Sequence, residues 1–175
     1  MVETYTYFRD STFGNGAVLY SGELPELPAA ESDAKPDYEI ESHRRTFALH
    51  ESGDSDKHTV LTGKFNGLFR TSAVIRGEQL VSLANKRGIF NDGWVFTYLA
   101  DTYTWKVAIF GKRWELRDSS KTVLARMERA QWRYTKIGVL EFLADVDRDL
   151  KHLVILTCKI VHWQIKSSEA AAASS

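Results

Sequence analysis

Five histidines are the side chains of this sequence best suited to acid–base or metal chemistry: His43, His50, His58, His152 and His162. Their spacing matches no zinc site formed with cysteines or with paired carboxylates. The last two stand ten residues apart on a predicted helix, too far to share a metal ion, and we expect them near the helix ends, close to solvent. The sequence also lacks a Gly-x-Ser-x-Gly elbow, a phosphate-binding loop and a dinucleotide fingerprint. It therefore predicts no catalytic residue, no metal site and no cofactor.

Catalytic groups that are distant in sequence can still meet in space, and one region of this chain is suited to that. His43, His50 and His58 lie on or beside neighbouring predicted strands, with Asp54 and Asp56 in the loop between them. Any catalytic centre that the sequence hides is expected among these five residues.

A basic segment over residues 112–136 is the candidate binding site. It holds eight Lys or Arg residues against three acids. Residues 1–57 carry 12 acids and 5 bases, net −7, and the rest of the chain carries net +7. Such asymmetry can mark a surface for anionic partners. The alternative, which we favour for most of these residues, is that they form solvated strand faces partly neutralised by the acidic N-terminal loops.

One aromatic residue lies within this basic segment. Trp132 stands between Arg129 and Arg133, a combination that suits insertion at a membrane interface or stacking on a base. The residues predicted to bind an anion or a lipid head group are Lys112, Arg113, Arg129, Trp132, Arg133 and Lys136.

Alternating apolar and polar residues predict the elements that must position these side chains. Tyr103, Trp105 and Val107 alternate with polar neighbours, as in a half-buried antiparallel strand. A change of apolar parity within 38–49 suggests a bulge there. Twelve strands are expected, near 4–8, 17–21, 38–49, 58–65, 70–76, 79–84, 94–99, 102–110, 113–118, 121–128, 131–136 and 139–144. So many short strands joined by turns favour a barrel.

Residues 145–166 predict a helix that is apolar on most sides. Three aspartates crowd its start, where carboxylates cap free N–H groups. Lys151, His152 and Lys159 interrupt it too often for a membrane span. Such a helix is buried in a core, and Cys158 on its apolar stripe is interpreted as a small core residue. The fold class predicted is mainly β: a closed antiparallel β-barrel of about twelve strands around one buried C-terminal hydrophobic helix.

The length of 175 residues indicates a single domain, expected over 1–168. Flexible loops are predicted at 22–37 and 51–57, and the Ala- and Ser-rich residues 169–175 are expected to be a disordered tail. The N-terminus has no basic-then-apolar signal region, so a cytoplasmic protein, or one peripheral to a membrane, is expected.

Several short motifs stand along the strand pattern and the closing helix: Gly16-Ala-Val-Leu-Tyr20, Tyr103-Thr-Trp105, Trp114-Glu-Leu-Arg-Asp118, Thr122-Val-Leu-Ala-Arg126, Leu140-Glu-Phe142 and Asp149-Leu-Lys-His-Leu-Val-Ile-Leu-Thr157. With these motifs, the chain resembles the tubby C-terminal-like superfamily, which includes tubby proteins, phospholipid scramblases and plant LURP-one-related proteins, and within it a fungal family of unknown function. The resemblance covers roughly residues 4–166, with the best agreement from residue 100 onward.

This resemblance implies a closed barrel threaded by the helix. Tubby proteins bind phosphoinositides through basic residues, but those positions do not align with this chain, so none is carried over. The calcium and palmitoylation motifs of scramblases are absent from the sequence.

Two hypotheses about function follow. The first is a non-enzymatic binding module that recognises anionic lipid head groups or a protein partner at a membrane surface. The second is a small-molecule-binding enzyme or carrier with a pocket at a barrel mouth. A barrel filled by a helix leaves little interior for a substrate, which favours the first. The neutral net charge argues against nucleic acid as a partner.

Overall fold

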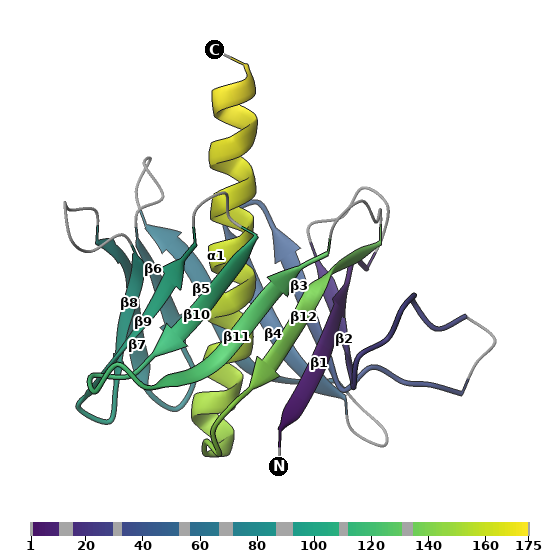
Figure 1. Cartoon of the computed structure of the whole chain (residues 1–175), viewed down its shortest axis with the longest axis horizontal. Coiled ribbons are helices and arrows are strands. Elements are labelled where there is room, and N and C mark those ends of the chain that lie inside the picture. Colours follow the sequence, from purple (N-terminus) through teal and green to yellow (C-terminus); the bar gives the residue numbers. More distant parts are fainter. Residues whose placement is uncertain are drawn as a thin grey trace.

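The computed structural model describes residues 2–10, 16–29, 33–52, 57–66, 72–86, 93–108, 112–130 and 135–174. Within these residues, twelve antiparallel strands close into one barrel around a C-terminal helix, which confirms the predicted fold class (Figure 1). The strands are β1 (Glu3–Phe8), β2 (Ala17–Ser21), β3 (Tyr38–His43), β4 (Thr46–Ser52), β5 (Lys57–Asn66), β6 (Ser72–Arg76), β7 (Leu80–Lys86), β8 (Gly93–Tyr98), β9 (Asp101–Val107), β10 (Arg113–Arg117), β11 (Val123–Arg129) and β12 (Lys136–Phe142).

The sheet follows the order of the chain. Every strand pairs with the next one in sequence, and β1 closes the barrel against β12, with Glu3 opposite Phe142. Because each pair is antiparallel, β1 begins and β12 ends at the same end of the barrel, where α1 (Arg148–Ala173) also starts. We call this the entry end and the opposite one the exit end. Figure 1 shows α1 running through the barrel and projecting past the exit end.

Alternation within the strands fills the barrel with side chains. In β9, for example, Tyr103 and Trp105 are buried while Thr104 between them is only half-buried. The indole of Trp105 donates a hydrogen bond to the Thr157 hydroxyl of α1 over 2.9 Å. The helix comes so close to β5 that a Cβ on Gly63 would lie 3.0 Å from Ile160. The interior is therefore a packed core shared by helix and sheet.

The start of α1 agrees with the prediction, but its end does not. Asp147 is the N-cap, and its carboxylate accepts a hydrogen bond from Leu150 N over 2.9 Å. The helix was expected to end near residue 166, with residues 169–175 as a disordered tail. It continues instead to Ala173, as suits a run of alanines, the residue with the highest helix propensity.

The structure also contradicts the exposure predicted for the two histidines of α1. His152 and His162 were predicted near solvent at the helix ends, but each is only 5% exposed. Both belong to the continuously buried part of α1, residues 152–162, which packs inside the barrel. Lys159 is buried as well, at 4% exposure.

The predicted strand at 38–49 is in fact a hairpin. β3 and β4 are joined by a tight turn at Arg44 and Arg45, with His43 opposite Thr46. Arg44 adopts a φ of 54°, a conformation that Gly or Asn normally provides in such turns. Because the turn contains neither residue, no signal for it was present in the sequence. The parity change within 38–49 thus reflects this turn and not a bulge. The strands predicted at 131–136 and 139–144 correspond to β12 alone, and residues 131–134 lie outside the described part of the chain.

Candidate functional site

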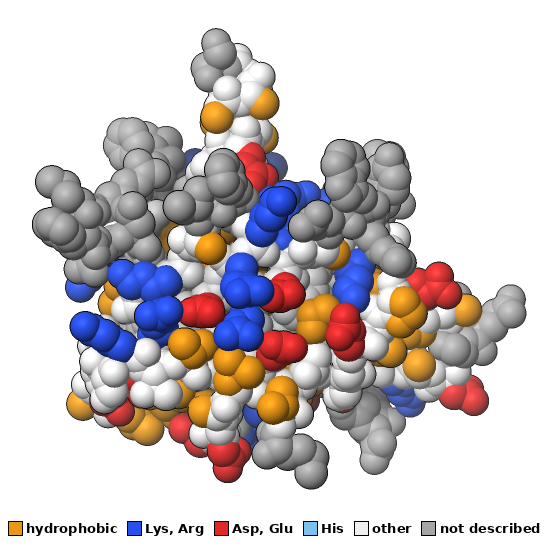
Figure 2. Space-filling model, viewed as in Figure 1, with side chains coloured by type: hydrophobic (Ala, Val, Ile, Leu, Met, Phe, Trp, Pro, Cys, Tyr) orange, Lys and Arg blue, Asp and Glu red, His pale blue; other side chains and the backbone are white. Residues whose placement is uncertain are grey.

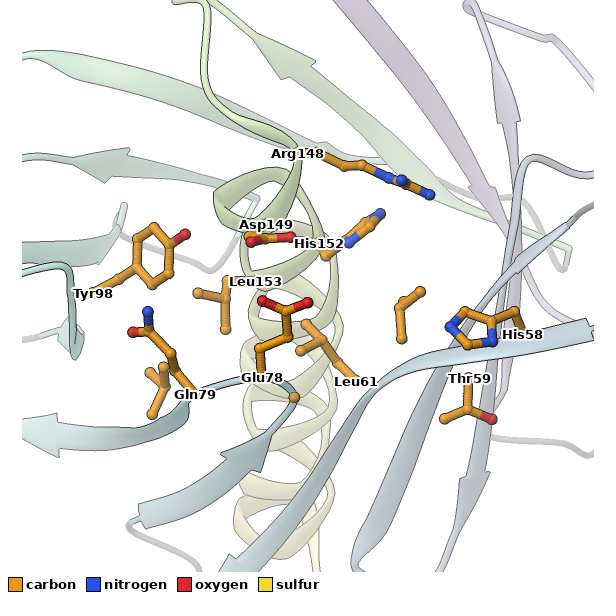
Figure 3. A pocket seen from close by; sticks show the side chains of 13 residues that line it. His58, Thr59, Leu61, Glu78, Gln79, Tyr98, Arg148, Asp149, His152 and Leu153 are labelled. Carbon is orange, nitrogen blue, oxygen red and sulfur yellow. The ribbon is translucent and has the colours of Figure 1, made fainter.

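A pocket of about 450 Å³ opens at the entry end, between the start of α1 and the strands beside it (Figure 3). This volume lies within the range typical of small-molecule sites. Its lining residues come from β5 (His58, Thr59, Val60, Leu61), from the β6–β7 turn and β7 (Gly77, Glu78, Gln79, Val81), from β8 (Tyr98) and from α1 (Arg148, Asp149, His152, Leu153).

The first turns of α1 present four side chains to this pocket from one helix face. Arg148 and His152 are four residues apart, as are Asp149 and Leu153, so each pair lies on the same side of the helix. The cap at Asp147 fixes where the helix begins and therefore where these side chains point. Tyr98 adds a weak hydrogen bond, 3.5 Å from its hydroxyl to the Asp147 carboxylate.

His152 is the buried polar group of the pocket. Its Nε2 has no hydrogen-bond partner within the described residues, and the nearest carboxylate oxygen, on Glu51, is 3.9 Å away. The ring packs edge-on against Tyr38. Burial lowers the pKa of His152, and the Glu51 carboxylate opposes this only in part. The imidazole is therefore neutral near pH 7, and one of its ring nitrogens is a buried polar atom without a hydrogen bond among the described residues.

The charged residues at this end are only partly neutralised. Arg148 forms an ion pair with Glu51, and Lys151 forms one with Glu3 at 2.6 Å. In the part of the chain that the structure describes, Glu78 and Asp149 form no ion pair, and neither is buried. The pocket mouth therefore carries two unneutralised carboxylates.

The residues predicted to bind anions lie elsewhere, toward the exit end. Lys112 and Arg113 precede or begin β10, Arg129 ends β11, and Lys136 begins β12. Trp132 and Arg133 lie outside the described residues.

Three of the six predicted anion-binding side chains have partners within the protein. Arg113 contacts Glu128 at 2.6 Å, and Arg129 makes a two-pronged contact with Glu169 of α1 at 2.9 and 3.2 Å. The Lys136 ammonium donates a hydrogen bond to the Leu24 carbonyl over 2.7 Å. The structure thus brings the basic residues near one end of the barrel, but pairs three of them internally.

The neighbouring strand faces show the same neutralisation. Lys106 on β9 lies opposite Glu115 on β10, which lies opposite Arg126 on β11, which lies opposite Glu141 on β12. Glu115 contacts Arg117 at 2.8 Å and Arg126 at 3.4 Å, and these cations lower the pKa of its carboxyl. Figure 2 shows basic and acidic side chains interspersed on this face. This supports the interpretation of these charges as solvated strand faces.

The predicted histidine cluster is only partly assembled. His58 lines the pocket, whereas His50 is buried beside Thr59, with 3.0 Å between His50 Nδ1 and the Thr59 hydroxyl. Glu41 lies 3.7 Å from the other ring nitrogen, beyond hydrogen-bond distance. His43 does not line this pocket. Asp54 and Asp56 lie outside the described residues.

The sequence reasoning missed Glu78, Gln79, Tyr98 and Arg148, because they belong to elements far apart in the chain and share no spacing. One signal was present: Arg148, Asp149 and His152 are polar residues at the start of an otherwise apolar buried helix. Within the described residues, no cluster of histidine, cysteine and carboxylate side chains could hold a metal ion.

No family model, no curated protein and no solved structure matches this chain. The resemblance to the tubby C-terminal-like superfamily therefore remains a prediction. No helix among the described segments is long and apolar enough to cross a membrane.

Proposed function

We propose that this protein is a binding module that takes up a small organic molecule in the pocket at the entry end. The observation that carries the proposal is the pocket itself, which is lined by groups from four parts of the chain. One of them is His152, whose buried Nε2 has no hydrogen-bond partner among the described residues. Buried polar groups are normally hydrogen-bonded, and exceptions in a concave site are typical of ligand-binding groups.

The architecture explains why a ligand would bind there. The helix fills the barrel interior, and the core side chains are packed from β1 to β12. Space for a ligand is therefore expected only where the helix enters or leaves the barrel. At the entry end, the first turns of α1 lie beside β5, the β6–β7 turn and β8, and the pocket is the space left between them (Figure 3).

This proposal corresponds to the second hypothesis from the sequence, in its non-enzymatic form. The first, recognition of anionic lipid head groups, has less support because Arg113, Arg129 and Lys136 are engaged within the protein.

The contact between Thr59 and His50 is the observation that would support an enzymatic role. The Thr59 hydroxyl lies within hydrogen-bond distance of His50, and Thr59 lines the pocket. A hydroxyl beside an imidazole is the start of a nucleophile–base pair. If any activity is detected, loss of turnover with intact folding and binding in His50→Ala would replace the binding proposal with an enzymatic one.

The proposal is tested by blocking the pocket mouth. Gln79 lines the pocket from an exposed turn, so Gln79→Trp should fill the mouth without disturbing the core. The matched control is Leu80→Trp, at the next residue, which is 71% exposed and does not line the pocket.

Native mass spectrometry of the freshly purified wild-type protein should reveal a co-purifying small molecule. We expect that molecule to be lost in Gln79→Trp and retained in Leu80→Trp. The proposal is overturned if nothing co-purifies and a chemically diverse fragment library leaves the NMR signals of the pocket residues unchanged. Equal retention of the ligand by both variants would likewise overturn it.

A further inference from the structure

The charge of the pocket points to the chemistry of its ligand. Glu78 comes from the β6–β7 turn and Asp149 from the first turn of α1, so two distant parts of the chain supply one carboxylate each. Figure 3 shows both carboxylates facing the space between the start of α1 and the β6–β7 turn. A positively charged group placed there would contact both.

The cations near this pocket do not already satisfy these carboxylates. Arg148 is paired with Glu51 and Lys151 with Glu3. Among the described residues, neither Glu78 nor Asp149 has an ion-pair partner. His152 adds no positive charge near pH 7, because burial lowers its pKa.

The dipole of α1 disfavours a cation at this end of the helix, but its effect is weaker than the attraction from the two carboxylates. The start of a helix carries about half a positive charge. Here the Asp147 carboxylate already accepts a hydrogen bond from Leu150 N, and Asp145 adds a further negative charge nearby. Two unneutralised carboxylates outweigh the remaining dipole, so the mouth attracts cations.

The rest of the pocket is suited to an apolar body. Leu61, Val81 and Leu153 line it, and all three are at least nine-tenths buried. The ring of Tyr98 adds an aromatic face, which favours a nearby cation. Together the lining joins an acidic mouth to an apolar floor.

We propose that the ligand is an organic amine, with its ammonium group held between Glu78 and Asp149 and its apolar body packed against Leu61, Val81 and Leu153. This inference rests on the proposed function, because it names the ligand class of the same pocket.

The test compares three probes of equal size that differ only at one end: phenylbutylamine, phenylbutanol and phenylbutanoate. Binding to the full chain is followed by NMR shifts of the pocket residues at pH 8 and low salt, where screening of surface charges is weak. The amine should bind about tenfold more tightly than the alcohol, and the carboxylate should bind most weakly.

Variants then assign the selectivity to the two carboxylates. Glu78→Gln and Asp149→Asn should each weaken amine binding by roughly threefold to fivefold, the upper part of the range for exposed ion pairs, and leave alcohol binding unchanged. The matched control is Asp145→Asn, which removes the same charge close to the helix start but outside the pocket lining. Thermal melting checks that each variant is folded.

The outcomes separate the two proposals. Equal binding of all three probes, or preference for the carboxylate, overturns the amine inference while leaving a ligand pocket in place. Amine selectivity that survives the double variant Glu78→Gln/Asp149→Asn also overturns it. If none of the probes binds and no fragment shifts the pocket signals, both proposals fail.

Discussion

Replacing Lys159 by methionine should make this protein more stable. Lys159 projects from the middle of α1 into the barrel core and is 4% exposed. Its ammonium has one described hydrogen bond, a long one of 3.4 Å to the Gly16 carbonyl. An ammonium group needs three acceptors and strong solvation, so this burial is expensive.

The magnitude follows from the pKa of the buried amine. Loss of solvent lowers the pKa of Lys159 from 10.5 to about 8, although Asp10 acts in the opposite direction. A change of this size corresponds to about 3 kcal/mol of destabilisation at neutral pH. The methionine variant leaves the Gly16 carbonyl without its weak partner, which costs about 1 kcal/mol. The net gain is about 2 kcal/mol, or roughly 4–8 °C in Tm for a chain of this size.

The lowered pKa of Lys159 also makes the free energy of unfolding of the wild-type protein depend on pH. The folded-state pKa is lower than the unfolded one, so between them the unfolded state binds more protons. The free energy of unfolding should therefore rise by about 2 kcal/mol between pH 7 and pH 9.5 from this lysine alone. Burial raises the pKa of the adjacent Cys158 thiol to about 12, so that thiol stays protonated over this range.

The assay is urea unfolding of wild-type protein and Lys159→Met at several pH values from 7 to 9.5. At each pH, the free energy of unfolding of the wild-type protein is subtracted from that of Lys159→Met, which removes the effect of every titration that both proteins share. The difference should be largest at pH 7 and shrink toward pH 9.5. Lys166→Met, on the same helix but only partly buried, is the control and should change stability little. If Lys159→Met is no more stable than wild type at pH 7, or the difference is independent of pH, the buried-charge reasoning is wrong.

Three further predictions concern the core, a turn and the surface. Thr157→Val removes the acceptor of the buried Trp105 N–H at nearly constant volume, and urea unfolding should show a loss of about 1–3 kcal/mol; a neutral change would contradict the bond. Ala100→Gly relieves a φ of 69° in the β8–β9 turn and should stabilise by about 0.5–1 kcal/mol, seen as a higher Tm, whereas a lower Tm would refute the strain. If the basic residues formed a lipid site, vesicle co-sedimentation would require acidic lipid, fall with salt and be abolished by charge reversal at Lys112 and Arg129. Because Arg129 is paired with Glu169, we expect weak binding, and tight, salt-sensitive binding would restore the lipid hypothesis.

The sequence was sufficient to predict the barrel and its helix, because both follow from local patterns of burial. In β9, β10 and β11 the alternation of apolar and polar residues gave strands within a few residues of the observed ones. The apolar circumference of α1 likewise predicted its burial, and Leu153 and Val154 are core residues as such a helix requires.

The turns between strands and the C-terminal end of α1 were harder to predict, because the residue types there do not indicate the conformation that they adopt. The β3–β4 turn uses two arginines, and the β8–β9 turn uses Leu99 and Ala100, both at positive φ. Neither turn contains the Gly or Asn that normally marks such a conformation. The burial of His152 and His162 depends on how far the wall extends around the helix, which composition alone does not give.

The periodicity of the sequence thus determined which residues face inward, and through them the barrel and its central helix. Which side chains lie together at the entry end depends instead on how the barrel closes in the tertiary structure. Glu78, Tyr98 and Asp149 line one pocket because β6, β7 and β8 end or begin where α1 starts, although as many as 71 residues separate them in the sequence. Closure also paired Arg129 with Glu169 and Arg113 with Glu128, so the basic segment is partly neutralised by its neighbours. Charge and burial depend on distances in space, and spacing along the chain does not record them.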